Sequence, residues 1–298
     1  MDHMDEYAEL LRRKRAVTKL NQLSSDLLQI NDQRPEAWVC LALNHQSKGN
    51  GNAEQSISFV ERALRLDGRY VYAHYIRGML FLLEQQPDEA ITSFNYANKI
   101  RKDVSHYEGL VEAYLMDEKY KEAVCMAKEA MVIAPKDPRT FTLIGLALSH
   151  SPATSRDGKE KAKRAFKKAL LIDPYAIRPV FALADLYTRE EDFGACVELL
   201  SRAIEGHGRP EEQDMIHAKL ADVCAVADNY ADALSHYHMA LSMNPGNVVA
   251  RRGLDRLEKL MRGVDPDASG ANDNSEENDE EMDDSTNFEA DAEEMGYL

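Results

Sequence analysis

Residues 71–102 read VYAHYIRGMLFLLEQQPDEAITSFNYANKIRK. Within this stretch the small residues Gly78 and Ala90 stand near the large residues Phe81 and Phe94. Two antiparallel helices approach closely only where the crossing residues are small, and large residues beside them fill the groove. The stretch therefore predicts a pair of antiparallel helices packed on one another.

The same pattern recurs along the chain. An alanine late in each second helix returns at spacings of 33 to 39 residues: Ala63, Ala97, Ala130, Ala169, Ala203 and Ala240. A period near 34 residues with small, aromatic and Pro residues at matching positions is typical of tetratricopeptide repeats. Loop-forming residues at 149–158 and 206–210 account for the two longer spacings. Pro135, Pro174 and Pro245 mark where second helices must stop.

These units predict an all-α fold, a tetratricopeptide-repeat superhelix (α-solenoid) of about seven helix pairs with a C-terminal capping helix and a disordered acidic tail. Residues 1–34 form a first, weaker pair, residues 35–246 form six tetratricopeptide repeats, residues 247–263 form the cap and residues 264–298 form the tail. The alternative, a generic helical bundle, does not explain the recurring Gly/Ala, aromatic and Pro positions.

The net charge of −16 is unevenly placed. Residues 264–298 hold fourteen Asp and Glu and no Lys or Arg, which leaves 38 acidic and 36 basic residues before them. A nearly neutral body gives no reason to expect nucleic-acid binding. No apolar run reaches the roughly 18 residues of a membrane span, and residues 1–15 lack an apolar signal core. We expect a soluble, unsecreted protein without nucleic-acid or membrane partners.

Motifs for catalysis are absent: the sequence contains no nucleophile elbow, phosphate-binding loop, zinc-protease motif or kinase set. His217, His236 and His238 are read as surface or groove residues, because two histidines two apart on a helix point in different directions. Cysteines lie far apart without a CxxC pair, which predicts free thiols in or near the core: Cys40, Cys125, Cys196 and Cys224. We therefore expect no catalytic, cofactor or metal site and no small-molecule substrate.

Two basic segments and the tail leave alternatives open. Residues 12–15, Arg-Arg-Lys-Arg, fit either a nuclear import signal or a solvated turn. The basic face of residues 159–168 fits either an acidic partner or a solvated surface. The tail, 264–298, either solubilises the protein, docks on a basic surface or is phosphorylated on its serines. Its last residues, 295–298, add a small hydrophobic end that could serve as a peptide ligand.

First helices line the concave face of such an array. By repeat position, eight side chains should face this groove and contact a neighbouring subunit or a peptide tail: Tyr72, Tyr75, Glu108, Glu112, Arg139, Arg178, Phe181 and Asp185. The carboxylate clamp of chaperone adaptors needs Lys and Asn at the fifth and ninth repeat positions. Those positions hold Val39 and Leu43 in one unit and Glu108 and Glu112 in another. The sequence therefore argues against a carboxylate-clamp chaperone adaptor.

Three segments in order carry a resemblance to a known family. They are residues 105–115 (SHYEGLVEAYL), residues 160–163 (EKAK), and residues 253–259 (GLDRLEK) followed by the acidic tail. The chain resembles the seventh subunit of the anaphase-promoting complex, or cyclosome, and its plant members in particular. The resemblance implies a non-catalytic scaffold subunit of a ubiquitin ligase that acts on mitotic regulators. It also implies nuclear and cytoplasmic location, other tetratricopeptide subunits as partners, and self-association as a further option.

Members of this family usually carry further repeats upstream, so we expect this chain to be a short form or a fragment. The family forms homodimers through N-terminal repeats, which leaves self-association of this chain open. The alternative function is that of a tetratricopeptide adaptor in another assembly, such as a transport or ciliary complex.

Overall fold

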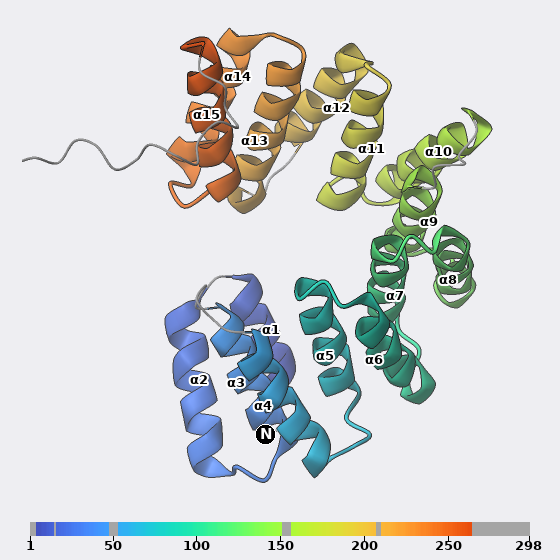
Figure 1. Cartoon of the computed structure of the whole chain (residues 1–298), viewed down its shortest axis with the longest axis vertical. Helices are drawn as coiled ribbons and strands as arrows, with labels where there is room; N and C mark the ends of the chain where they lie inside the picture. The colour runs from blue at the N-terminus through green and yellow to red at the C-terminus, as the bar shows by residue number, and fades with distance from the viewer. Residues whose placement is uncertain (1–3, 15, 48–52, 151–155, 207–209, 264–298) are drawn as a thin grey trace, which may run out of the picture.

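The computed structural model describes residues 4–14, 16–47, 53–150, 156–206 and 210–263. Consecutive helices lie side by side in pairs, and the pairs follow a curved path (Figure 1). Within these ranges seven pairs run from α1 to α14, and α15 follows as a single helix. This arrangement confirms the predicted α-solenoid. The residue boundaries predicted for its four parts stay predictions, and the tail lies outside the described residues.

In chain order, the helices of the described residues are α1 (Met4–Arg13), α2 (Val17–Ile30), α3 (Pro35–Ser47), α4 (Ala53–Leu66), α5 (Val71–Leu83), α6 (Pro87–Ile100), α7 (Val104–Met116), α8 (Tyr120–Ile133), α9 (Pro138–His150), α10 (Arg156–Ile172), α11 (Ile177–Arg189), α12 (Phe193–Gly206), α13 (Pro210–Val226), α14 (Tyr230–Met243) and α15 (Val248–Met261). None of these helices is long and apolar enough to cross a membrane.

Aromatic rings of the second helices press against glycines of the first helices. Phe94 on α6 is fully buried, and a Cβ atom added to Gly78 on α5 would lie 2.7 Å from its ring. Gly109 on α7, the first helix of the next pair, meets the same ring at still closer range. A side chain at either glycine would occupy the space of the ring. One aromatic residue therefore joins the two helices of its own pair and the pair that follows.

The turns between paired helices share one backbone feature. Gln85, Glu118, Glu191 and Asp228 each have a positive φ, between 55° and 59°, and each lies in the turn between a first and a second helix. This left-handed conformation ends a helix by turning the chain away from its axis. It places the second helix antiparallel to the first after only a few residues.

First helices form the inner side of the curved array. Consecutive first helices contact one another, α5 with α7, α7 with α9 and α9 with α11. Each second helix packs mainly against its own first helix and the next one. First helices of neighbouring units therefore contact one another while, in the described residues, second helices of neighbouring units share no comparable contact, so the first helices form the concave side.

The core continues from pair to pair and includes three of the four cysteines. Cys40, Cys196 and Cys224 are buried, and all four thiols are free. The exception is Cys125 on α8, which is exposed. Its predicted place in or near the core is wrong, because it lies on the outer side of a second helix, two residues before the buried Ala127.

Candidate protein-interaction face

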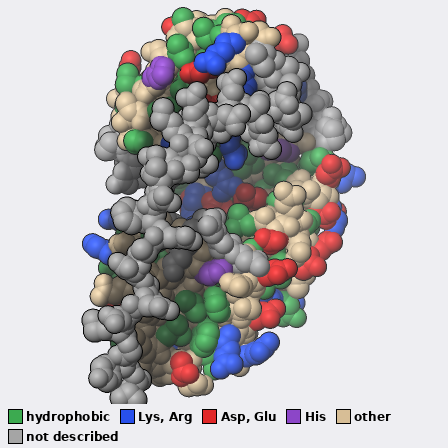
Figure 2. Space-filling model, turned by 60° about the vertical axis from the view of Figure 1, so that its left-hand side comes forward, with side chains coloured by type: hydrophobic (Ala, Val, Ile, Leu, Met, Phe, Trp, Pro, Cys, Tyr) green, Lys and Arg blue, Asp and Glu red, His purple; other side chains and the backbone are tan. Residues whose placement is uncertain are grey.

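All eight residues predicted to face the groove lie on first helices: Tyr72 and Tyr75 on α5, Glu108 and Glu112 on α7, Arg139 on α9, and Arg178, Phe181 and Asp185 on α11. The structure gathers them in three groups along the inner side. In Figure 2, acidic and basic side chains lie next to one another in the hollow at the middle of the molecule. Contact of these residues with a partner stays a prediction.

The first group is aromatic. The rings of Tyr72 and Tyr75 stack with their centroids 6.0 Å apart, and Tyr75 also faces the ring of His106 on α7 at 5.7 Å. The Tyr72 hydroxyl donates to Glu9 on α1 at 3.5 Å, so it reaches past α3. Burial lowers the pKa of His106, which keeps this imidazole neutral near physiological pH.

These tyrosines line a cavity of about 490 Å³. Its other walls come from α1, α3 and the connections that lead into α5 and α7, and they carry five carboxylates and two arginines: Glu6, Glu9, Glu36, Asp67, Asp103, Arg69 and Arg101. Aromatic faces and carboxylates both attract cations. The cavity therefore offers a recess for a basic or aromatic side chain of a partner.

The second group is an ion-pair cluster built around Arg178. Its guanidinium lies 3.3 Å from Glu112 and 3.9 Å from Glu108, both on α7. Burial raises the pKa of Glu108, while Arg178 and Arg139 act in the opposite direction. Arg139 itself is held by Asp137 at 2.7 Å and donates to Ser105 on α7 at 3.3 Å. An arginine of α11 thus contacts α7 across the intervening α9.

The third group lies between α11 and α13. Asp185 pairs with Lys219 on α13 at 2.5 Å. Phe181 lines two cavities, one of about 280 Å³ beside α9 and one of about 360 Å³ beside α13. Its ring therefore lies at the junction of three first helices.

Several residues of this face were missed by the sequence. Glu9 and His106 complete the aromatic group, and Lys219 completes the third group. Lys219 lies 34 residues after Asp185, whereas the equivalent position of the next first helix, 37 residues on, holds Asp222. Comparing equivalent positions of neighbouring repeats for opposite charges therefore does not find this pair. No local signal marks Glu9 either, because its partner Tyr72 is two repeats away.

One histidine of the last repeat, His217, differs from its prediction, whereas His238 is exposed as predicted. His217 on α13 is buried, not a surface or groove residue, and its Nδ1 lies 3.2 Å from Nδ1 of His236 on α14. The two rings stack because the positions face each other where the helices pack. Among the described residues no group of three or more His, Cys, Asp and Glu side chains could hold a metal ion.

Comparison with known sequences identifies relatives of this chain. A tetratricopeptide-repeat family model matches residues 48–103. Anaphase-promoting complex subunit 7 of Arabidopsis thaliana is 38% identical over 266 residues, which cover 89% of this chain and 46% of the relative. The subunits 7 of Dictyostelium discoideum and Homo sapiens are 31% and 28% identical, over 89% and 86% of this chain and 44% of each relative. The chain spans about half the length of these curated relatives.

Solved structures share the fold. One chain of the crystal structure of the APC/C hetero-tetramer Cut9-Hcn1 superimposes with a TM-score of 0.61 at 17% identity, covering 86% of this chain and 49% of that one. A tetratricopeptide protein of Thermus thermophilus gives a TM-score of 0.53 at 18% identity, covering 64% and 99%.

The repeated helix pairs define the class of fold: the chain has the α-solenoid architecture of tetratricopeptide repeats. Within that class it is related in sequence to anaphase-promoting complex subunit 7. The predicted resemblance is confirmed, and the plant relative has the highest identity of the three compared.

Proposed function

We propose that this chain is a non-catalytic scaffold subunit of the anaphase-promoting complex, a ubiquitin ligase, and supports ubiquitination of mitotic regulators and cell-cycle progression. The observation that carries the proposal is the 38% identity with subunit 7 of that complex along 89% of the chain. The ubiquitin-transfer chemistry would belong to other subunits. The proposal places the protein in the nucleus and the cytoplasm.

The inner face supplies the contacts in this proposal. Other tetratricopeptide subunits of the ligase are its partners, with self-association as a further contact. Tyr75 and Phe181 would act as apolar anchors, and the charges around Arg178 would fix the orientation of the partner. Nucleic acid, membranes and small-molecule substrates have no role in this function.

Affinity purification of the tagged chain from dividing cells, followed by mass spectrometry, tests the proposal. We expect subunits of the ligase among the enriched proteins, and we expect the enrichment to survive nuclease treatment. Recovery of a different assembly without ligase subunits would overturn it. An unrelated tetratricopeptide protein with the same tag controls for non-specific capture.

A further inference from the structure

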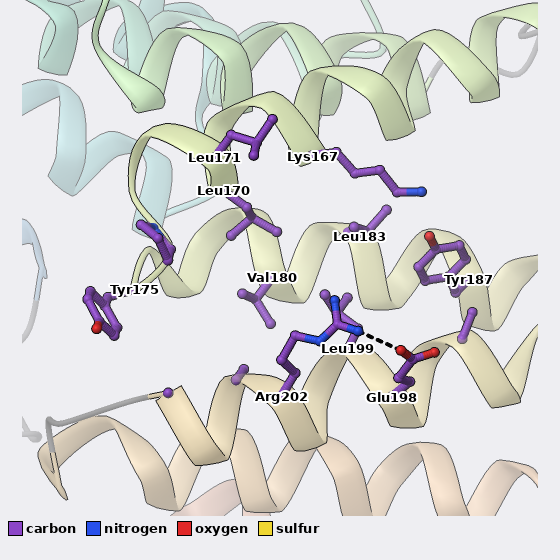
Figure 3. A pocket seen from close by; sticks show the side chains of 14 residues that line it. Lys167, Leu170, Leu171, Tyr175, Val180, Leu183, Tyr187, Glu198, Leu199 and Arg202 are labelled. Carbon is purple, nitrogen blue, oxygen red and sulfur yellow. Dashed lines mark hydrogen bonds and ion pairs between the residues drawn. The ribbon is translucent and has the colours of Figure 1, made fainter.

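An apolar groove lies on the outer side of the array, where α10, α11 and α12 meet (Figure 3). Its volume is about 690 Å³, and its walls include Leu170, Val180, Leu183 and Leu199. Leu171 at its edge is 83% exposed. Full burial of a side chain as apolar as leucine contributes roughly 1.5–3 kcal/mol of favourable free energy. Binding of an apolar segment over this groove is therefore favourable.

Positive charge borders the groove on the side of α10. In Figure 3 the Lys167 side chain extends along one edge, while Arg202 at the opposite edge is paired with Glu198 at 2.6 Å. Within the part of the chain that the structure describes, Lys167 makes no hydrogen bond or ion pair. Arg164, one turn earlier on α10, is exposed and is equally free of such partners among the described residues. The occupant should therefore combine apolar side chains with negative charge.

This chain contains a segment of that composition. Residues 264–298 hold fourteen acidic and no basic residues, and they finish in Glu293-Glu294-Met295-Gly296-Tyr297-Leu298. We infer that the apolar side chains of residues 295–298 bind in the groove, with Glu293 and Glu294 beside Lys167 and Arg164. The tail would thereby fold back onto the outer face of its own repeat array.

Length permits this contact. Thirty-five residues follow Gly263 and span roughly 120 Å when fully extended. A flexible chain of that length has an end-to-end distance of about 30–35 Å. α15 packs on α13, and α13 packs on α11 and α12, so the groove is a few interhelical distances of about 8–10 Å away. Tethering supplies an effective concentration on the order of 1 mM, so even a weak contact is populated.

Photocross-linking of the full chain tests the occupant. A benzophenone side chain placed at Tyr297 should form adducts with α10, α11 and α12 within the same molecule, at a yield that does not depend on protein concentration. Adducts elsewhere on the chain would overturn the inference. Adducts between two copies, or with other proteins in an extract but not within the purified chain, would overturn it as well.

Charge reversal supplies a matched pair of variants. Lys167→Glu should lower the yield of groove adducts about tenfold, a change equivalent to about 1.4 kcal/mol. Lys128→Glu reverses the corresponding charge on α8, one repeat earlier and also exposed, and should leave the yield unchanged. Equal yields in both variants would exclude the proposed contact of Lys167 with the tail. The inference does not rest on the proposed ligase function, and neither result bears on that function.

Discussion

At the scale of single residues, the array depends on a few close contacts between a glycine and an aromatic ring. Phe166 on α10 lies against Gly145 on α9 in the same way as Phe94 lies against Gly78, and a Cβ at Gly253 on α15 would lie 2.5 Å from Tyr237. The last contact joins the single C-terminal helix to the final pair. The same device therefore repeats at the end of the array.

Gly109→Ala should destabilise the protein by about 1–3 kcal/mol, because the added methyl group collides with the buried ring of Phe94. Chemical denaturation followed by circular dichroism measures this change. Gly194→Ala on α12 is the matched control, since a Cβ there meets nothing within 4 Å. It should be neutral or stabilise by up to about 1 kcal/mol through helix propensity. Equal effects of the two variants would contradict the role of the ring.

Buried histidines should make stability depend on pH. Burial lowers the pKa of His74 and His106, and burial together with neighbouring His236 lowers that of His217. The unfolded chain, with His pKa values near 6.5, then binds more protons than the folded one as the pH falls. The stabilisation is present above about pH 6.5 and is lost as the pH drops through the folded-state pKa values.

Thermal unfolding of the wild type should therefore occur at a lower temperature at pH 5.5 than at pH 7.5. The variant His106→Gln removes one of the three titrating groups and should show a smaller difference between the two pH values. An unchanged difference in that variant would show that His106 does not contribute. Measurements at matched ionic strength separate this effect from screening of surface charges.

At the scale of helices and turns, most of the fold could be predicted. The recurring alanines predicted the number and order of the helix pairs, because only small residues fit where two helices cross. Contacts between units could not be predicted in the same way. The pairs Arg178–Glu112 and Tyr72–Glu9 join first helices two units apart, and their distance depends on the curvature of the array. Curvature arises from small rotations at every interface and leaves no local pattern.

The left-handed turn residues offer a test at this scale. Gln85 has φ 57°, a conformation that is unfavourable for residues with a Cβ atom and neutral for glycine. Gln85→Gly should stabilise the protein by about 0.5–1 kcal/mol in a denaturation experiment. The neighbouring residue Glu84 has a negative φ of −81° in the native structure, so Glu84→Gly should instead destabilise the protein. The opposite sign at either position would contradict this account.

At the scale of the whole molecule, the eight residues predicted to face the groove lie on first helices, but the sequence did not predict how they gather in groups. Repeat position alone identifies the inner side. It does not reveal that Glu108 forms an ion pair with Arg178, or that Phe181 lines two cavities. Those details depend on side chains from three or more helices, which a single repeat does not contain.

Tyr75→Ala and Phe181→Ala should each weaken capture of the partner subunits about tenfold or more, since truncating an aromatic anchor costs at least 1–2 kcal/mol. Pull-down with quantified ligase subunits measures the loss, and circular dichroism verifies that each variant is folded. Val132→Ala, at an exposed position on the outer side of α8, should leave capture unchanged. Unchanged capture by both groove variants would show that another surface holds the partner.

The bridge from α11 to α7 has a mechanical consequence. In a stack where every unit contacts only its neighbours, each interface deforms independently when the array is extended. The ion pairs of Arg178 connect α11 to α7, the first helices on either side of α9, so these three units should deform together as one stiffer segment. Because Arg178 is about half exposed, with a side-chain exposure of 46%, concentrated salt screens its charge. The pitch of the superhelix should then lengthen at α9 first, which small-angle X-ray scattering would record as a larger radius of gyration.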